Sequence, residues 1–394
     1  MSAPSIPLDA DLIIVGGGCA GLSLASRLAA SRSTLRVLVL EGREHYEEDR
    51  TWCGWRTASH PYQECAVAAW PKWRITTTHE TIERSSYRYP YEMIPADRFY
   101  AESCRVIGNC ATVSVVMAAP VATLNERGGS YARGGSVTTD LLDGRSFSSK
   151  WLIDTRPRIT ALRPPSLWQN FVGYAVHGSQ TLAKRIGDTP VLMDFQLPGT
   201  SAVQFIYVLP LGAGAYLCEW TRFSKERGEE TKIEQQLLEW IGENAGQHWF
   251  PGRRESGSLP MSLVTRKLHA PGSIVLAGTA GGSMRASTGY AFHSIQRWAD
   301  ACCDALLAGE APVPPVRNRA LDFMDDVFLR ALQQPDSSGE AIFCSLFKHT
   351  EPDALVRFLS GQPRLADYWP VMRSLPWIDF SIAALQSLSG VGVR

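Results

Sequence analysis

The sequence predicts a mixed α/β fold, and three patterns along its 394 residues support this prediction. Near the start, a short apolar run, a glycine-rich turn, a helical pattern and a second apolar run follow one another, which is typical of a β–α–β unit. Residues 165–223 carry alternating and apolar stretches separated by turn residues, as strands do. Residues 318–390 are mostly helical in pattern. We therefore expect a Rossmann-type domain, a β-rich domain and a C-terminal helical region.

Composition narrows the class of protein. Apolar residues make up 45% and charged residues 20%, as in globular proteins. Lys and Arg together number 39, the same as Asp and Glu, so the chain lacks the positive charge that binding to nucleic acid needs. The nine cysteines are an odd number without CxxC spacing, and HExxH is absent, so we expect neither a disulfide framework nor a metal site. Without a signal-peptide pattern or a spanning apolar run, we expect a cytoplasmic protein.

The first β–α–β unit carries a nucleotide-binding pattern. Residues 11–15 predict a strand that ends at Gly16-Gly17-Gly18-Cys19-Ala20-Gly21, and a helix follows. In a Gly-x-Gly-x-x-Gly turn, the first glycine allows the tight turn, the second lets a pyrophosphate approach, and the third allows close packing of helix on strand. Glu41 stands at the end of the next strand, where a carboxylate accepts hydrogen bonds from a ribose. This context predicts dinucleotide binding, with Cys19 and Ala20 at the helix N-terminus beside the phosphates.

The glycine motif alone does not distinguish FAD from NAD as the bound dinucleotide. Its place at the N-terminus, and a second strand that ends at Ala277-Gly278, favour FAD. A third strand ends in Asp154. Gly278-Thr279 and Asp154-Thr155-Arg156-Pro157 both differ from the Gly-Asp and Asp-Gly texts of large FAD-dependent hydroxylases. This difference argues against a standard aromatic hydroxylase.

We expect discontinuous domains. Residues 1–70, 95–165 and 265–310 are assigned to an FAD-binding domain. Residues 71–94 and 166–264 are assigned to a β-rich substrate-binding domain, and residues 311–394 to the C-terminal helical region.

A series of short motifs resembles the bacterial lycopene β-cyclases in order and spacing, from about residue 11 to residue 390. After the β–α–β start, they are Arg50-Thr51-Trp52, Trp168-Gln169-x-Phe171-x-Gly173, Phe205-Ile206-Tyr207-Val208-Leu209-Pro210, Glu219-Trp220-Thr221-Arg222-Phe223-Ser224, Glu255-x-Gly257-x-Leu259-Pro260-Met261, Thr288-Gly289-Tyr290, Ser338-Gly339-Glu340, Arg357-Phe358-Leu359-Ser360-Gly361 and Leu375-Pro376.

The resemblance implies a flavoprotein that performs no net redox chemistry on its substrate. Such an enzyme needs reduced FAD, with NAD(P)H as the reductant. A carboxylic acid protonates the terminal double bond of a linear carotenoid, a ring closes on the carbocation, and loss of a proton gives the β-ionone ring. Glu219 aligns with the first carboxylate of the family's Glu-Asp-Thr or Glu-Glu-Thr motif, so we expect it in the acid–base site. An acid in an apolar pocket keeps its proton at neutral pH, which suits this chemistry.

Several positions depart from the family's pattern, and they indicate a divergent member. Trp220 replaces the second acid of the Glu219 motif. Residues 50–55 read Arg-Thr-Trp-Cys-Gly-Trp where the family commonly has His-Thr-Trp-Ser-Phe-His, and Arg285-Ala286-Ser287 replaces a His-Pro. A changed prenyl or polyene substrate is therefore one interpretation.

The remaining candidates each have a structural alternative. Arg50 and Arg98 are candidates for FAD phosphate or ribityl oxygens, the alternative being surface charge. Trp52, Trp55 and Trp220 could line a substrate tunnel, where aromatic faces stabilise a carbocation, or pack in the core. We also assign Asp154, Gly278, Thr288 and Gly289 to the cofactor, and Arg285 and Tyr290 to the substrate. His293 receives no role.

Two other classes of function stay open. One is an FAD-dependent monooxygenase or oxidoreductase acting on another apolar polyene, a prenylated or an aromatic substrate. The other is a flavin-binding protein that sequesters carotenoid without converting it. Because a carotenoid dissolves in a bilayer, we expect peripheral association with the inner face of the membrane. The oligomeric state and the number of ring closures are left open.

Overall fold

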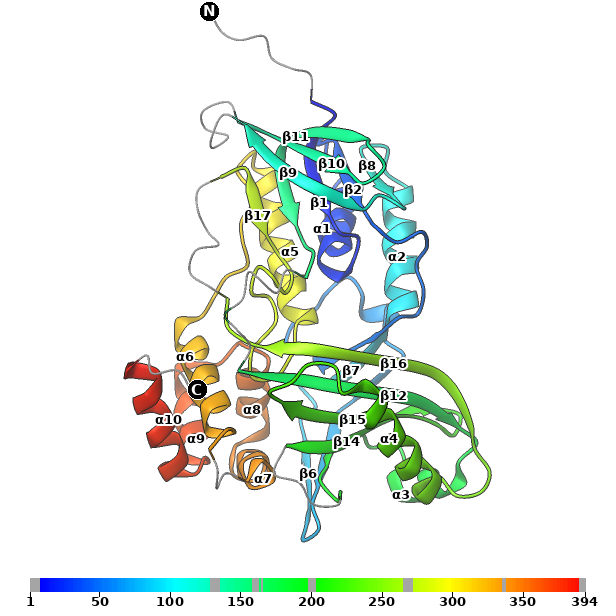
Figure 1. Cartoon of the computed structure of the whole chain (residues 1–394), viewed down its shortest axis with the longest axis vertical. Helices are drawn as coiled ribbons and strands as arrows, with labels where there is room; N and C mark the ends of the chain where they lie inside the picture. The colour runs from blue at the N-terminus through cyan, green and yellow to red at the C-terminus, as the bar shows by residue number, and fades with distance from the viewer. Residues whose placement is uncertain are drawn as a thin grey trace, which may run out of the picture.

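The computed structural model describes residues 8–127, 135–157, 163, 166–197, 203–264, 272–334 and 338–389. Its elements form two large sheets at opposite ends of the molecule, with a small sheet between them and a group of C-terminal helices beside the second large sheet (Figure 1). The prediction of a mixed α/β fold is confirmed. No helix within the described ranges has the length and apolar character needed to cross a membrane.

The first sheet contains the β–α–β unit, and its strand order is β8-β2-β1-β11-β10-β9, with β17 beside β11. β1 lies between β2 and β11, parallel to both, and antiparallel strands extend the sheet at one edge. Helix α1 packs against α2 and α5. The bounds are β1 (Ala10–Val15), α1 (Cys19–Ala30), β2 (Val37–Leu40), α2 (Ala96–Gly108), β8 (Val113–Val116), β9 (Val121–Arg127), β10 (Ser136–Leu141), β11 (Ser146–Asp154), β17 (Ile274–Leu276) and α5 (Phe292–Leu307).

The second sheet has the order β16-β12-β15-β14-β13-β5-β6, and its central strands pair in antiparallel fashion. Helix α4 packs on one face through an apolar cluster that includes Trp220 and Trp240. The bounds are β5 (Lys72–Thr76), β6 (Thr81–Ser85), β12 (Leu167–His177), α3 (Gln180–Ile186), β13 (Val191–Asp194), β14 (Gln204–Gly212), β15 (Ala215–Ser224), α4 (Glu230–Asn244) and β16 (Phe250–Met261).

The small sheet joins the two ends of the molecule, with the order β3-β7-β4. Its strands are β3 (Thr51–Trp55), β4 (Ala68–Trp70) and β7 (Tyr91–Pro95), and the short 3-10 helix η1 (Gln63–Cys65) precedes β4. The stretch 71–94, assigned to one β-rich domain, is thus shared between two sheets. The domain division stays a prediction, and its boundaries at residues 165 and 265 lie outside the described residues.

The C-terminal helices are fastened to the rest of the chain by a buried ion pair. Arg285, in the loop before α5, pairs with Asp325 on α6 over 3.0 Å, and the Ser287 hydroxyl donates to the same carboxylate over 2.8 Å. The Arg285 guanidinium also lies over the Phe358 ring. The helices are α6 (Arg319–Ala331), α7 (Gly339–His349), α8 (Pro352–Leu359), α9 (Leu365–Arg373) and α10 (Trp377–Ser389).

Replacing Asp325 should destabilise the fold strongly. Asp325→Ala leaves the buried Arg285 guanidinium without its counter-ion, which costs about 3–5 kcal/mol. Glu80→Ala is the matched control, because Glu80 pairs with Lys348 in an exposed ion pair worth about 0–1 kcal/mol. Urea unfolding measures both free energies. A loss of under about 1 kcal/mol in Asp325→Ala would contradict the role of this pair.

Candidate functional site

The glycine-rich turn between β1 and α1 has the geometry of an anion-binding turn. Gly16 adopts a φ of +97°, which favours glycine. A Cβ at Gly21 would lie 1.9 Å from the Gly16 carbonyl oxygen, so a side chain is excluded there. A Cβ at Gly18 would meet no atom within 4 Å, so the backbone there faces open space. Cys19 and Ala20 begin α1, whose first backbone N–H groups have no partner within the helix and attract anions.

Glu41 is held at the edge of this turn. The Gly17 N–H donates to its Oε2 over 2.7 Å, and the Arg43 guanidinium pairs with its Oε1 over 3.1 Å. Burial alone would raise the pKa of Glu41, but the hydrogen bonds from Arg43 and Gly17 hold this pKa below its ordinary value. The group is therefore a fixed carboxylate acceptor beside the turn.

A ligand with hydroxyl groups fits beside Glu41. Within the described ranges, the buried Tyr46 hydroxyl has no hydrogen-bond partner, and it lies 2.5 Å from where a Gly17 Cβ would stand. Gly278, with a φ of +62°, closes the other side of the turn, since its Cβ would stand 3.4 Å from that of Ala20. An open backbone cradle, a fixed carboxylate and an unpaired hydroxyl suit a nucleotide.

The three polar residues Asp154, Arg98 and Arg50, which were predicted to contact the cofactor, lie in different surroundings. Asp154 is fully buried, and its carboxylate is bound by Arg156 over 2.9 Å. Arg98 is exposed on α2. Arg50 lines the mouth of a large cavity, where it pairs with Asp49 over 2.6 Å. Of these three, the structure brings only Arg50 to a cavity.

The large cavity has a volume of about 1160 Å³, including its mouth, and lies between the second sheet and the loop 287–290. Most of its lining is apolar or aromatic. Polar residues, among them Asp49, Arg50, Glu219 and Glu255, form the smaller part of the lining, as in many sites for apolar ligands. The lining includes Thr288, Gly289 and Tyr290 of the loop, Glu219 and Glu255 of the sheet, and Phe171, Leu192, Met193, Phe205, Tyr207, Leu217, Phe223, Leu259, Phe343, Phe347 and Leu359.

Glu219 lies in a row of residues that crosses four strands. On β15 it pairs with Tyr207 of β14 on one side and with Gly173 of β12 on the other, and Gly173 pairs in turn with Glu255 of β16. Residues in such a row share a face of the sheet. A Cβ at Gly173 would stand 3.3 Å from Cβ of Glu219 and 3.4 Å from Cγ of Glu255. Because Gly173 has no side chain, the two glutamates lean over it.

The Glu219 carboxyl is protonated at neutral pH. Its burial, and to a lesser extent the negative charge of Glu255, raise its pKa to about 8. The Thr221 hydroxyl donates to Glu219 Oε1 over 2.8 Å and opposes this shift. A carboxyl that stays neutral in an apolar cavity can donate a proton.

Glu255 is the functional candidate that the sequence did not single out. It is buried, pairs with Arg253 over 2.8 Å and accepts a hydrogen bond from the Thr51 hydroxyl over 3.0 Å. Arg253 also pairs with Glu48 over 2.9 Å. The available signal was its place in the Glu255-x-Gly257 motif, but nothing local to that motif indicates that it faces Glu219.

Three tyrosines close the cavity beside Glu219. The hydroxyls of Tyr91 and Tyr207 lie 2.8 Å apart, and Tyr290 packs edge-on near Tyr91. Burial raises the pKa of all three above the ordinary value, so they remain neutral. Gln169 lies at the same end, and its buried Oε1 has no partner within the described residues.

The tryptophan candidates do not line this cavity. Trp220 follows Glu219 on β15, so its side chain points to the opposite face, where it packs with α4. Trp52 packs against Phe99 and Phe292. Trp55 is fully buried behind Tyr91 and Tyr290. Trp220 therefore lies away from this cavity, and its contact with a substrate stays a prediction.

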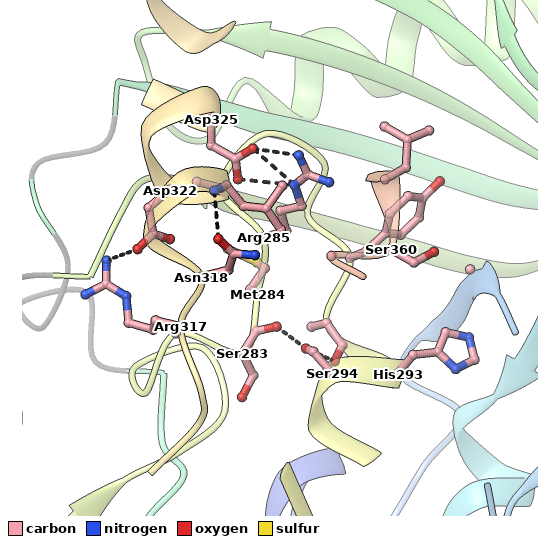
Figure 2. A pocket seen from close by; sticks show the side chains of 18 of the residues that line it. Ser283, Met284, Arg285, His293, Ser294, Arg317, Asn318, Asp322, Asp325 and Ser360 are labelled. Carbon is pink, nitrogen blue, oxygen red and sulfur yellow. Dashed lines mark hydrogen bonds and ion pairs between the residues drawn. The ribbon is translucent and has the colours of Figure 1, made fainter. Parts of the chain in front are cut away.

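A smaller cavity lies between the N-terminal end of α5 and α6. Figure 2 shows its ion pairs, Arg285 with Asp325 and Arg317 with Asp322. Arg285, a substrate candidate, is thus engaged by Asp325. His293 also lines this cavity, and burial lowers its pKa to about 3, so it is neutral.

His293, Glu92 and His60 together could offer three ligand atoms to a metal ion. However, Glu92 is already paired with His60 over 2.7 Å and with Arg56 over 3.2 Å. The Arg56 charge would oppose a cation at this place. We read the cluster as a buried polar network that ties α5 to the small sheet.

The titration of Glu219 should appear in the stability of the protein. The folded chain keeps this proton up to about pH 8, whereas the unfolded chain releases it near the ordinary glutamate pKa of 4.5. Between these values the folded state binds more protons, so the free energy of unfolding falls as pH rises, on the order of 1 kcal/mol per pH unit. Urea unfolding at about pH 5 and about pH 8 should show this fall relative to Glu219→Gln. Parallel pH dependences in the two proteins would contradict it.

Comparison with solved structures shows the fold. A geranylgeranyl bacteriochlorophyll reductase-like protein from Thermoplasma acidophilum superimposes with a TM-score of 0.62 at 15% identity, over 97% of this chain and 98% of that one. The flavin-dependent monooxygenase PieE, solved with FAD and substrate, gives a TM-score of 0.60 at 14% identity, over 99% of this chain and 72% of that one. The chain thus has the Rossmann-type fold of these flavoproteins.

Comparison of sequences shows the family. The lycopene beta-cyclase of Pseudescherichia vulneris is 26% identical over 318 residues, which are 77% of this chain and 76% of that protein. A family model described as lycopene cyclase protein matches residues 11–387. Because that match covers nearly the whole sequence, the chain belongs to the lycopene cyclase family, as a divergent member.

Proposed function

We propose that this chain cyclises the ψ-end or ψ-ends of a linear carotenoid, converting lycopene to a β-ionone-ring product, with Glu219 in the acid–base site as the proton donor. The observation that carries the proposal is a buried carboxyl, its pKa raised by burial and by Glu255, in a cavity lined mostly by apolar and aromatic side chains. The family and the similarity to a lycopene beta-cyclase support this class of substrate.

The cofactor of the proposed reaction is reduced FAD, with NAD(P)H as the reductant. Gly16, Gly18, Cys19, Ala20 and Gly21 suit its phosphates and Glu41 its ribose. We assign the other end of the cofactor to Arg50, Thr288 and Gly289, at the cavity mouth, with Gly278 beside the turn. An electron-rich reduced flavin stabilises positive charge that exists only after protonation. Arg98 is exposed and Asp154 is bound by Arg156, so we assign Asp154 to holding the strand end.

The protein's part in the reaction is acid–base chemistry. Glu219 gives its proton to the terminal double bond, a carbon–carbon bond closes the ring, and the ring then loses a proton to a base. The Glu219 carboxylate formed in the first step can take that proton back, so no electron is gained or lost overall. Tyr91, Tyr207 and Tyr290 surround the acid, and aromatic faces stabilise a nearby cation. The apolar lining excludes water, which would otherwise add to the cation.

We further propose that the protein docks on the inner face of the membrane, where its substrate dissolves. Large apolar side chains that are exposed concentrate on α9 and α10: Leu365, Trp369, Met372, Trp377, Ile378, Ile382, Leu385 and Leu388. Beneath them is an apolar groove of about 1090 Å³, lined by α6, α7, α9 and α10. This groove and the Glu219 cavity share Ser287, Thr288, Phe343 and Leu359. We therefore propose a lipid bilayer as the partner of this apolar face, since an apolar polyene can move from the bilayer through the groove toward Glu219.

Conversion of lycopene tests the proposed function. The protein is incubated anaerobically with chemically reduced FAD and lycopene in liposomes, and products are separated and weighed by mass spectrometry. We expect a product of unchanged mass that absorbs at shorter wavelength. Glu219→Gln should lower the rate by about 10²–10⁴-fold, because general acid catalysis is lost. Glu230→Gln removes an exposed carboxylate on α4 and should leave the rate unchanged.

Other outcomes identify the alternatives. A product heavier by one oxygen atom, formed only in air with consumption of NAD(P)H, would replace the cyclase by a monooxygenase. If lycopene binds but is not converted, the result would indicate a protein that sequesters carotenoid without acting as an enzyme on it.

Liposome flotation tests the docking face. The wild-type chain should float with phosphatidylcholine vesicles, and the combined Leu365→Ser, Ile378→Ser and Leu388→Ser variant should partition at least about tenfold less, since each apolar side chain contributes about 1.5–3 kcal/mol when buried. Tyr87→Ser is the control, because Tyr87 is 76% exposed in the turn between β6 and β7. Equal flotation of the triple variant and the wild type would place the contact elsewhere.

A further inference from the structure

The cavity holds a second carboxyl group whose place in the sheet is as fixed as that of Glu219. Glu255 and Glu219 lie on the two strands that flank β12, both opposite Gly173. The strands of a sheet are about 4.8 Å apart, so a residue with a side chain at position 173 would stand between the two glutamates. Glycine there leaves the two side chains next to each other on one face.

Glu255 has a cation and a hydroxyl donor as its partners. Arg253 pairs with it and the Thr51 hydroxyl donates to it, and both interactions favour the charged form. Arg253 also pairs with Glu48, so this small network of two acids and one base carries one net negative charge. That charge faces Glu219 from β16.

The other groups that face Glu219 are neutral or paired. Tyr207 comes from β14, Tyr91 from β7, Tyr290 from the loop before α5, and Cys53 from β3, where burial raises the pKa of the thiol. Thr221, on the same strand, contributes a hydroxyl donor. Asp49 and Arg50, the remaining charged residues that line the cavity, form an ion pair with each other. Glu255 therefore supplies the charge that Glu219 meets.

We propose that Glu255 is a positioning residue that keeps Glu219 in its acid form. Position 220 points to the face covered by α4, so an acid there would not face Glu219, whereas position 255 does. The inference rests on the proposed function only in that Glu219 is the proton donor.

The pair also accounts for return of the proton. Once Glu219 has given up its proton, two carboxylates would face each other across Gly173, and like charges this close disfavour that state. Glu219 is then a strong base, which suits removal of the ring proton at the end of the cycle. In this scheme Glu255 transfers no proton itself.

Infrared titration of the full-length chain tests the proposal without substrate. The carbonyl band of a protonated carboxyl, taken as the difference from Glu219→Gln, reports the titration midpoint of Glu219. In Glu255→Gln, referenced to the double variant with Glu219→Gln, the midpoint should fall by about one pH unit, because the like charge is gone. Glu255→Asp keeps the charge and should keep the midpoint well above that of Glu255→Gln. Glu230→Gln, on the far side of the sheet, should leave it unchanged.

A second variant works in the opposite direction. Arg253→Gln removes the cation beside Glu255, so the Glu219 midpoint should rise. If Glu255→Gln does not fold, the titration midpoint of Glu219 in Arg253→Gln tests the proposal in its place. An unchanged midpoint in Glu255→Gln, or a fall in Arg253→Gln, would overturn the proposal. Neither titration depends on cyclisation. If the midpoint moves as expected but the protein does not convert lycopene, the proposed function would be refuted, while the effect of Glu255 on Glu219 would be confirmed.

Discussion

A carboxyl group that is taken out of water into an apolar cavity holds its proton, and the second sheet is arranged around that constraint. Most residues that line the cavity around Glu219 are aromatic or apolar. Among the described residues its hydrogen-bond donor is the Thr221 hydroxyl, and Arg50 and Arg253 are paired with other acids. Had Arg253 paired with Glu219 in place of Glu255, the same carboxyl would be ionised at neutral pH. The identity of the acid depends on which of two neighbouring glutamates binds the arginine.

Local patterns in the sequence were sufficient for the first sheet. The glycine turn, the helix after it and the acid at the end of β2 lie within one short segment, so residue order alone predicts their contacts. The helical C-terminal region was also predicted from the sequence pattern: residues 318–390 contain the helices α6 to α10. These elements are specified by contacts between near neighbours.

The carboxyl pair could not be predicted in the same way. Glu219 and Glu255 are brought together by the register of β15, β12 and β16, which depends on hydrogen bonds between distant segments. Trp220 is different, because strand alternation already implied that it faces away from Glu219. Arg285 and Asp154 show a third case: each has a charged partner, Asp325 or Arg156, that satisfies it within the protein.

Gly173 has a consequence for how such a site can diverge. Because Gly173 has no Cβ, no side chain stands between the two glutamates. The pKa of Glu219 therefore depends on a residue that cannot itself be ionised. Relatives could therefore change the pH range over which they work by exchanging one small residue, while both glutamates stay in place. Comparison of the acidic residues alone would overlook that kind of tuning, since the variable part is the spacer between them.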